Sequence, residues 1–285
     1  MGKLNTQFYV MIKPIGPVCN LNCTYCYYLH KKDLYAGQGD WRMAEPLLEK
    51  FIKEYIGSQD AEEIDFPWQG GEPTLLGIDF FRKVVELQKR YCPPTKRIQN
   101  DIQTNGTLLD EQWGRFLAEN RFLAGLSIDG PQEMHDLYRR TKENQPTFDK
   151  VFAAARLLQK YQVDFNTLTV VHRLNAKKPL EVYRFLRDEV GSRYIQFIPG
   201  VEPKDFMQVA PQYWDKGRLP VVDSLQARPG APDSVVTDWS VDPEEFGDFL
   251  IAVFDEWLRK DVGKVFIPLF EAALNRWLGQ PSPVC

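Results

Sequence analysis

The sequence has no apolar run long enough to cross a bilayer, and its first residues lack the apolar core of a signal peptide. It also has no excess of basic residues: it contains 35 Lys and Arg and 39 Asp and Glu, which gives a net charge of −4. Without a basic stripe to meet phosphates, we expect no nucleic-acid partner, and we expect no membrane partner. Cysteine is scarce as well. The five cysteines are odd in number and clustered, which does not fit a disulfide framework and favours a reducing cytoplasm.

Three of the five cysteines stand together near the start of the chain, as Cys19, Cys23 and Cys26. Thiolates select zinc, copper(I) or iron–sulfur clusters over hard cations. A structural zinc site or an ordinary cubane cluster takes four ligands, and the nearest further candidate, His30, follows Cys26 by only four residues. A loop with three thiolates and no clear fourth ligand suggests a cluster that leaves one iron open to bind something else.

Strand-like and helix-like stretches alternate over most of the chain, which predicts an α/β fold. We expect strands at 8–13, 64–69, 97–104, 122–128, 164–171 and 194–198, and helices at 45–56, 79–91, 110–119, 148–161 and 179–189. Six such β/α repeats imply a parallel sheet with right-handed crossovers. The pattern alone fits either an open doubly wound sheet or a partial barrel.

The last third of the chain does not continue the alternation of strands and helices. Several Pro and Gly and no sustained periodicity predict a long loop from 199 to 238, and apolar faces predict two further helices, at 243–258 and 267–278. We therefore expect an α/β domain at 1–200, a linker at 201–241 and a helical extension at 242–285.

Polar motifs follow the predicted strands, so one edge of the sheet should collect them. Gly70 and Gly71 follow the second strand, and two glycines let backbone approach a ligand closely because no Cβ intervenes. The carboxylate of Glu72 beside them suits the ammonium of an amino-acid head group. The alternative is a plain turn with a solvated glutamate. Arg139, or its neighbour Arg140, could hold a ligand carboxylate bidentately, or form a surface salt bridge instead.

The motifs together carry a family resemblance. The loop Cys19-x3-Cys23-x2-Cys26, with Tyr25 before the last cysteine, resembles the radical S-adenosylmethionine (SAM) enzymes. The resemblance continues through Gln69 to Thr74, Gln103 to Thr107 and Leu126 to Pro131. This combination is most similar to the anaerobic sulfatase-maturating enzymes, and the similarity runs from about residue 7 to the end of the chain.

The resemblance implies a partial (β/α)6 barrel of the TIM type with a helical extension, a [4Fe-4S] cluster on Cys19, Cys23 and Cys26, and SAM chelating its open iron. The residues that the resemblance assigns to SAM are Tyr25, Gln69, Gly71, Glu72, Ser127, Arg139 and Ile195. The family carries further cysteines for auxiliary clusters in a C-terminal domain, and Cys285 corresponds to the first of them. We therefore expect a truncated form or fragment.

The implied reaction is reductive cleavage of SAM to a 5′-deoxyadenosyl radical, which oxidises a sulfatase Cys or Ser to formylglycine. The implied partners are a sulfatase polypeptide and an electron donor such as a flavodoxin or ferredoxin. The family's catalytic base lies in the C-terminal region, so no catalytic residue is assigned in this chain. One alternative is another radical SAM peptide modification, such as thioether or crosslink formation. The other is a non-catalytic metal-binding module.

Two histidines complete the set of candidates. His135 reads as a surface histidine, and His172 follows the fifth predicted strand, where it could face a substrate. We expect Cys92 to be a thiol without a functional role.

Overall fold

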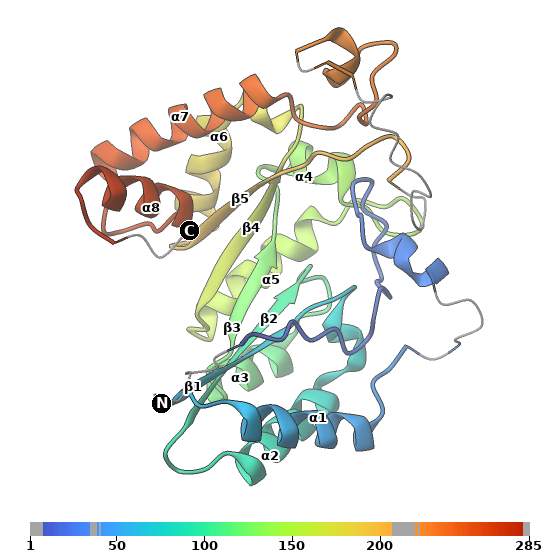
Figure 1. Ribbon diagram of the computed structural model, residues 1–285, viewed down its shortest axis with the longest axis vertical. Helices are drawn as coiled ribbons and strands as arrows, with labels where there is room; N and C mark the ends of the chain where they lie inside the picture. The colour runs from blue at the N-terminus through green and yellow to red at the C-terminus, as the bar shows by residue number, and fades with distance from the viewer. Residues whose placement is uncertain (1–7, 35–38, 40, 207–219, 222, 282–285) are drawn as a thin grey trace, which may run out of the picture.

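The computed structural model describes residues 8–34, 39, 41–206, 220–221 and 223–281 (Figure 1). Its centre is a five-stranded parallel sheet in the order β1-β2-β3-β4-β5. The strands are β1 (Glu63–Trp68), β2 (Arg97–Thr104), β3 (Leu123–Ser127), β4 (Phe165–Val171) and β5 (Ile195–Pro199). The sheet curls into a half-barrel, which confirms the predicted α/β partial barrel.

Helices link successive strands and cover the outer face of the sheet (Figure 1). They are α1 (Glu45–Ser58), α2 (Ile78–Tyr91), α3 (Glu111–Glu119), α4 (Gln132–Tyr138), α5 (Phe148–Lys160), α6 (Pro179–Arg184), α7 (Pro243–Lys260) and α8 (Pro268–Trp277). Shorter helical turns are η1 (Leu29–Leu34), η2 (Pro73–Leu76), η3 (Asn175–Lys177), η4 (Phe185–Glu189) and η6 (Leu225–Ala227).

Apolar side chains alternate with less buried residues along β1, and this alternation gives the sheet a buried outer face. Ile64, Phe66 and Trp68 are buried toward the helices, whereas the residues between them are more exposed. Helix α2 meets this face with an apolar stripe, in which Phe81 and Val84 are fully buried.

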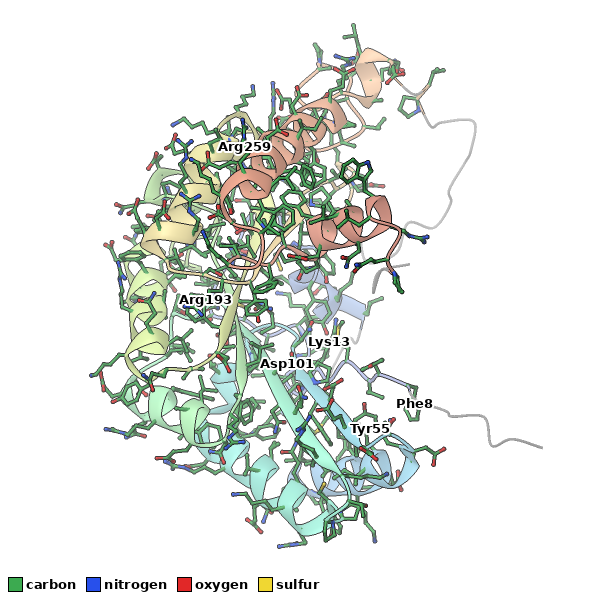
Figure 2. The ribbon with its side chains drawn as sticks, turned by 90° about the vertical axis from the view of Figure 1, so that its left-hand side faces the viewer. Phe8, Lys13, Tyr55, Asp101, Arg193 and Arg259 are labelled. Atoms are coloured by element: carbon green, nitrogen blue, oxygen red, sulfur yellow. The ribbon has the colours of Figure 1, made fainter. Side chains whose placement is uncertain are left out.

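The first predicted strand is much shorter in the structure than expected. Of residues 8–13, Ile12 alone forms a bridge, parallel to Trp68, and both Tyr9 and Met11 are exposed. Phe8 folds onto helix α1, with its ring 5.8 Å from that of Tyr55 (Figure 2). The expected buried strand was therefore wrong in extent, because this segment lies at the sheet edge with only one neighbour to pair with.

Two helical predictions need correction. Helix α4 lies where no helix was expected, since its seven residues are too few for a clear period. The helix predicted over 179–189 is α6 followed by the π-turn η4. Within the expected long loop, the described part contains η6 and an antiparallel bridge between Pro203 and Val236.

The C-terminal helices share the core of the half-barrel. Phe249, Val253 and Trp257 of α7 are fully buried in the same apolar cluster as the sheet. An ion network adds to this packing, in which the buried Glu256 of α7 is bonded to Arg184 and Arg187. Among the residues that the structure describes, no helix is long and apolar enough to cross a membrane.

Candidate functional site

The cysteine loop lies at the carboxyl edge of the parallel sheet (Figure 1). The chain reaches it from the segment that bridges to β1, and the loop then pairs antiparallel with the segment after α4 through a Leu21–Thr141 bridge. The loop is thus fixed on both sides by backbone hydrogen bonds. Parallel α/β folds place their chemistry at this edge.

The three thiols of the loop fit a cluster. Cys19, Cys23 and Cys26 are free and half-buried. The Sγ of Cys19 accepts N–H groups from Leu21 (3.3 Å) and from the Asn105 side chain (3.7 Å), as cluster-bound sulfurs do. Burial raises the pKa of Cys19 to about 11 and that of Cys23 to about 12. A bound metal centre would offset this by holding the thiolates.

The described residues contain no group of three His, Cys, Asp or Glu side chains placed to hold a single metal ion. A cubane cluster makes a different demand, because each of its thiolates binds a different iron and the sulfurs stand further apart. The donor set of three soft sulfurs with amide donors on one of them therefore suits a cluster rather than one ion.

The Gly70–Gly71 turn packs directly on the cysteine loop. The N–H of Gly71 donates to Gly16 O and that of Glu72 to Val18 O, both at 2.8 Å. A Cβ on Gly71 would lie 1.9 Å from the Val18 carbonyl oxygen. Only glycine allows this approach, so the turn after β1 sets the position of the backbone that leads into Cys19.

Glu72 joins two of the predicted motifs, Gln69 to Thr74 and Gln103 to Thr107. Its carboxylate is 1% exposed and accepts hydrogen bonds from the N–H and hydroxyl of Thr74, the hydroxyl of Thr104 and the N–H of Asn105, all between 2.6 and 3.1 Å. Burial raises its pKa although these donors oppose the shift. The solvated glutamate of the alternative interpretation is ruled out, and its role toward SAM stays a prediction.

The other SAM candidates divide into two groups. Gln69 and Ser127 lie at the carboxyl ends of β1 and β3, and the Ser127 hydroxyl accepts from Gln103 at 3.0 Å. Ile195, in contrast, begins β5 at the opposite edge and is 1% exposed. The structure therefore does not bring Ile195 to the site, because it lies at the amino end of its strand, away from the cysteine loop. Cys285 lies outside the described residues.

Arg139 is buried against Asp129, with Nε 3.0 Å from Oδ2, and the Tyr25 hydroxyl donates to the same oxygen. The arginine's charge holds the pKa of Asp129 below its usual range although burial opposes this, and Asp129 in turn raises the pKa of Arg139. The Arg139 guanidinium also lies over the Tyr25 ring, 5.6 Å from its centroid. Asp129 was not among the predicted site residues, because the sequence does not show that it lies beside Arg139.

Both histidines are fully buried, so the surface interpretation of His135 was wrong. His172 accepts the N–H of Leu174 at 3.2 Å and stands edge-on to the ring of Tyr138, with centroids 4.7 Å apart. His172 is therefore held within the protein, and a contact with a substrate stays a prediction.

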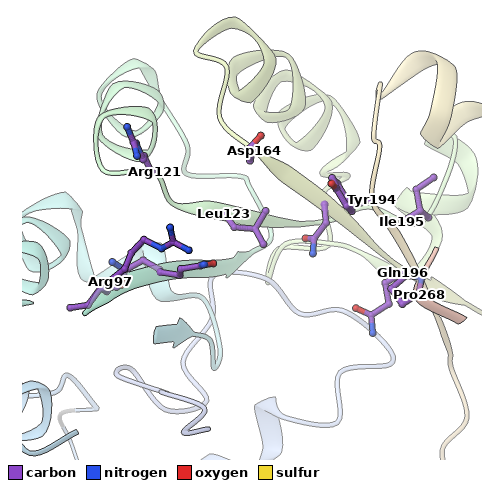
Figure 3. Close-up of a pocket in the computed structure, with 12 residues that line it drawn as sticks. Arg97, Arg121, Leu123, Asp164, Tyr194, Ile195, Gln196 and Pro268 are labelled. Carbon is purple, nitrogen blue, oxygen red and sulfur yellow. The ribbon is translucent and has the colours of Figure 1, made fainter. Parts of the chain in front are cut away.

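A cavity of about 570 Å³ lies elsewhere, at the amino ends of the strands (Figure 3). Its lining includes Arg97, Leu123, Asp164 and Tyr194, each at or next to the first residue of a strand. Since the cysteine loop and the glycine turn occupy the other edge of the sheet, this cavity is not part of the candidate site.

Comparison with known proteins agrees with this geometry. Residues 14–186 match the model of the radical SAM superfamily. The chain is 45% identical over 277 residues to the serine-type anaerobic sulfatase-maturating enzyme of Bacteroides thetaiotaomicron, covering 97% of this chain and 64% of that one. It is 35% identical to a cysteine-type enzyme of Clostridium perfringens, covering 68% of that chain.

Solved structures agree as well. Native anSMEcpe with bound AdoMet superposes with a TM-score of 0.78 at 34% identity, over 96% of this chain and 68% of that one. The same protein with AdoMet and the Cp18Cys peptide gives a TM-score of 0.76 at 35% identity, over 97% and 67%. The chain thus spans about two thirds of the length of these relatives. On sequence and on structure alike, the chain belongs to the radical SAM superfamily and, within it, to the anaerobic sulfatase-maturating enzymes.

Proposed function

We propose that this chain binds a [4Fe-4S] cluster through Cys19, Cys23 and Cys26, holds SAM beside it, and takes part in oxidising a sulfatase side chain to formylglycine. The observation that carries the proposal is the convergence of the cysteine loop, the glycine turn and the end of β3 at one edge of the sheet. When bound, the cluster and SAM would supply the electron transfer and the 5′-deoxyadenosyl radical that abstracts hydrogen from the substrate.

The chain's own residues position these groups. The Gly70–Gly71 turn brings backbone close to the SAM head group, and Glu72 holds that turn and the 104–105 turn together. Ser127 and Arg139 would meet the SAM carboxylate, with Gln69 at the neighbouring strand end and the Tyr25 ring packing against SAM. No residue of the chain is assigned as the base.

The substrate would be a sulfatase polypeptide, since the relatives are named for sulfatase maturation and one solved structure holds a peptide. The relatives include serine-type and cysteine-type enzymes, so a serine or a cysteine could be the residue oxidised. The electron would come from a flavodoxin or ferredoxin, and the free thiols of the loop suit the reducing cytoplasm.

The proposal is tested by anaerobic reconstitution, followed by iron counting and by assay of 5′-deoxyadenosine formed from SAM. Cys23→Ala should lose both the iron and the SAM cleavage, whereas Cys92→Ala, a matched change at a half-buried thiol outside the loop, should keep both. A Cys23→Ala protein that retained cluster and cleavage would defeat the assignment.

The substrate is tested separately, with peptides that carry the sulfatase motif with serine or with cysteine. An aldehyde product detected by mass supports sulfatase maturation. SAM cleavage with a thioether or crosslinked product would instead favour another peptide modification, and an inert zinc-bound protein would favour a binding module.

A further inference from the structure

Arg139 lies directly across the backbone from Cys23. The N–H groups on either side of Cys23 donate to the carbonyls on either side of Arg139, at 2.8 and 2.9 Å. These bonds continue the antiparallel register of the Leu21–Thr141 bridge. In such a register Cys23 and Arg139 form the non-hydrogen-bonded pair, whose side chains project from the same face and lie closest together. The arginine is therefore a cross-strand neighbour of a cluster ligand.

Asp129 fixes the side chain of Arg139. The aspartate is fully buried and the arginine side chain is 9% exposed, with Nε 3.0 Å from Oδ2. The other carboxylate oxygen accepts the Val170 N–H at 3.0 Å, which ties the pair to β4. Because both charges are withdrawn from solvent, salt screens them little. The positive charge of Arg139 and the negative charge of Asp129 are therefore held in place near Cys23.

A second set of bonds holds the backbone of Arg139. The Thr147 hydroxyl donates to Arg139 O at 2.7 Å, so its oxygen accepts from His135 Nε2 at 3.1 Å. The other ring nitrogen of His135 accepts the N–H of Asp129 at 3.4 Å. Both nitrogens are thus used by the neutral ring, and burial lowers the pKa of His135 to about 4. The histidine adds no charge near the cysteine, which leaves Arg139 and Asp129 as the opposed pair.

We propose that Arg139 and Asp129 act as positioning residues that set the reduction potential of the cluster bound through Cys23. The inference rests on the proposed function, because it requires the cluster. One-electron reduction adds negative charge to a cluster, so a fixed cation beside a ligand favours the reduced state and a fixed anion disfavours it. This use of Arg139 differs from a contact to the SAM carboxylate, since it operates before SAM binds.

The test is a mediated redox titration of the reconstituted full chain without SAM, in which dithionite supplies the electron and the EPR signal of the reduced cluster is followed. Arg139→Gln should shift the midpoint potential to more negative values, and Asp129→Asn should shift it to more positive values. Arg139→Lys keeps the charge and should stay near the wild-type potential. Glu256→Gln, which changes a buried carboxylate of α7 that is bonded to Arg184 and Arg187, should leave the potential unchanged.

The outcomes distinguish a failure of the proposed function from a failure of the inference about the reduction potential. If the wild-type chain binds no cluster, the proposed function fails. If it binds one, and Arg139→Gln and Asp129→Asn leave the potential unchanged or move it in the same direction, the inference fails while the function stands. Should Asp129→Asn not retain a cluster, Arg139→Gln against Arg139→Lys decides alone, and equal potentials in these two would overturn the proposal.

Discussion

Replacing Gly71 by alanine tests how tightly the glycine turn packs on the cysteine loop. The added Cβ would stand 1.9 Å from Val18 O and 2.4 Å from the Val18 carbonyl carbon. Neither atom belongs to a flexible side chain, so the backbone itself must move. Restoring a contact of 3.4 Å requires a displacement of about 1.5 Å, which is the difference between the two distances.

That displacement acts on two hydrogen bonds, from Gly71 N to Gly16 O and from Glu72 N to Val18 O. Overpacking costs about 1–3 kcal/mol, and each weakened hydrogen bond adds about 1 kcal/mol. We expect a loss of about 3–5 kcal/mol in the free energy of unfolding, and a Tm lower by roughly 6 to 10 °C. Because Val18 precedes Cys19, the reconstituted iron content should fall as well.

Gly247→Ala is the matched control. This glycine lies within helix α7 with nothing near the position of a new Cβ, so alanine should stabilise the helix by about 0.5–1 kcal/mol. Thermal unfolding followed by circular dichroism, together with iron counting after anaerobic reconstitution, measures both variants. A Gly71→Ala protein with the Tm and iron content of the wild type would refute the packing argument.

The remaining predictions concern hydrogen bonds and one ion network. Glu72→Gln should lower the free energy of unfolding, measured in urea, by about 3 kcal/mol. Thr74 and Asn105 donate hydrogen bonds to the two carboxylate oxygens, and glutamine would place an NH₂ donor against one of these donors. An unchanged urea midpoint at equal slope would contradict this. Asp110→Ala should cost about 1 kcal/mol by removing the N-cap of α3, whereas Asp110→Asn should cost little; equal Tm values for the two would argue against capping. Hydrogen bonds from Arg184 and Arg187 lower the pKa of Glu256 to about 2, below the unfolded value of about 4.3. The resulting stability is present above pH ~4.3 and is lost as the pH falls toward 2, so the fall of Tm across this window should be shallower in Glu256→Gln.

Much of the fold was predictable because the signals were periodic and local. Helices α2 and α3 both lie within one residue of the ranges expected for them, 79–91 and 110–119. The first strand was overestimated because the apolar character of residues 8–13 does not reveal that they lie at an edge. Helix α4 escaped prediction because seven residues show too little periodicity.

The site was predictable to the level of motifs but not of partners. The spacing of the cysteines and the glycines at a strand end indicated which segments would meet. The spacing could not show that Arg139 is held by Asp129, or that Glu72 is saturated by protein donors, because those contacts join distant parts of the chain. Ile195 was assigned to SAM from the resemblance, although it stands at the start of the strand predicted at 194–198, and the amino ends of the strands lie away from the cysteine loop.

The central claim is that three cysteines hold a cluster with one iron left open for SAM. Mössbauer spectroscopy of the anaerobically reconstituted chain, enriched in ⁵⁷Fe and recorded with and without SAM, tests this most directly. We predict about four irons per chain, with the signal of a single iron site changing when SAM is added. A cluster whose irons all carry protein ligands, and whose spectrum does not respond to SAM, would contradict the claim.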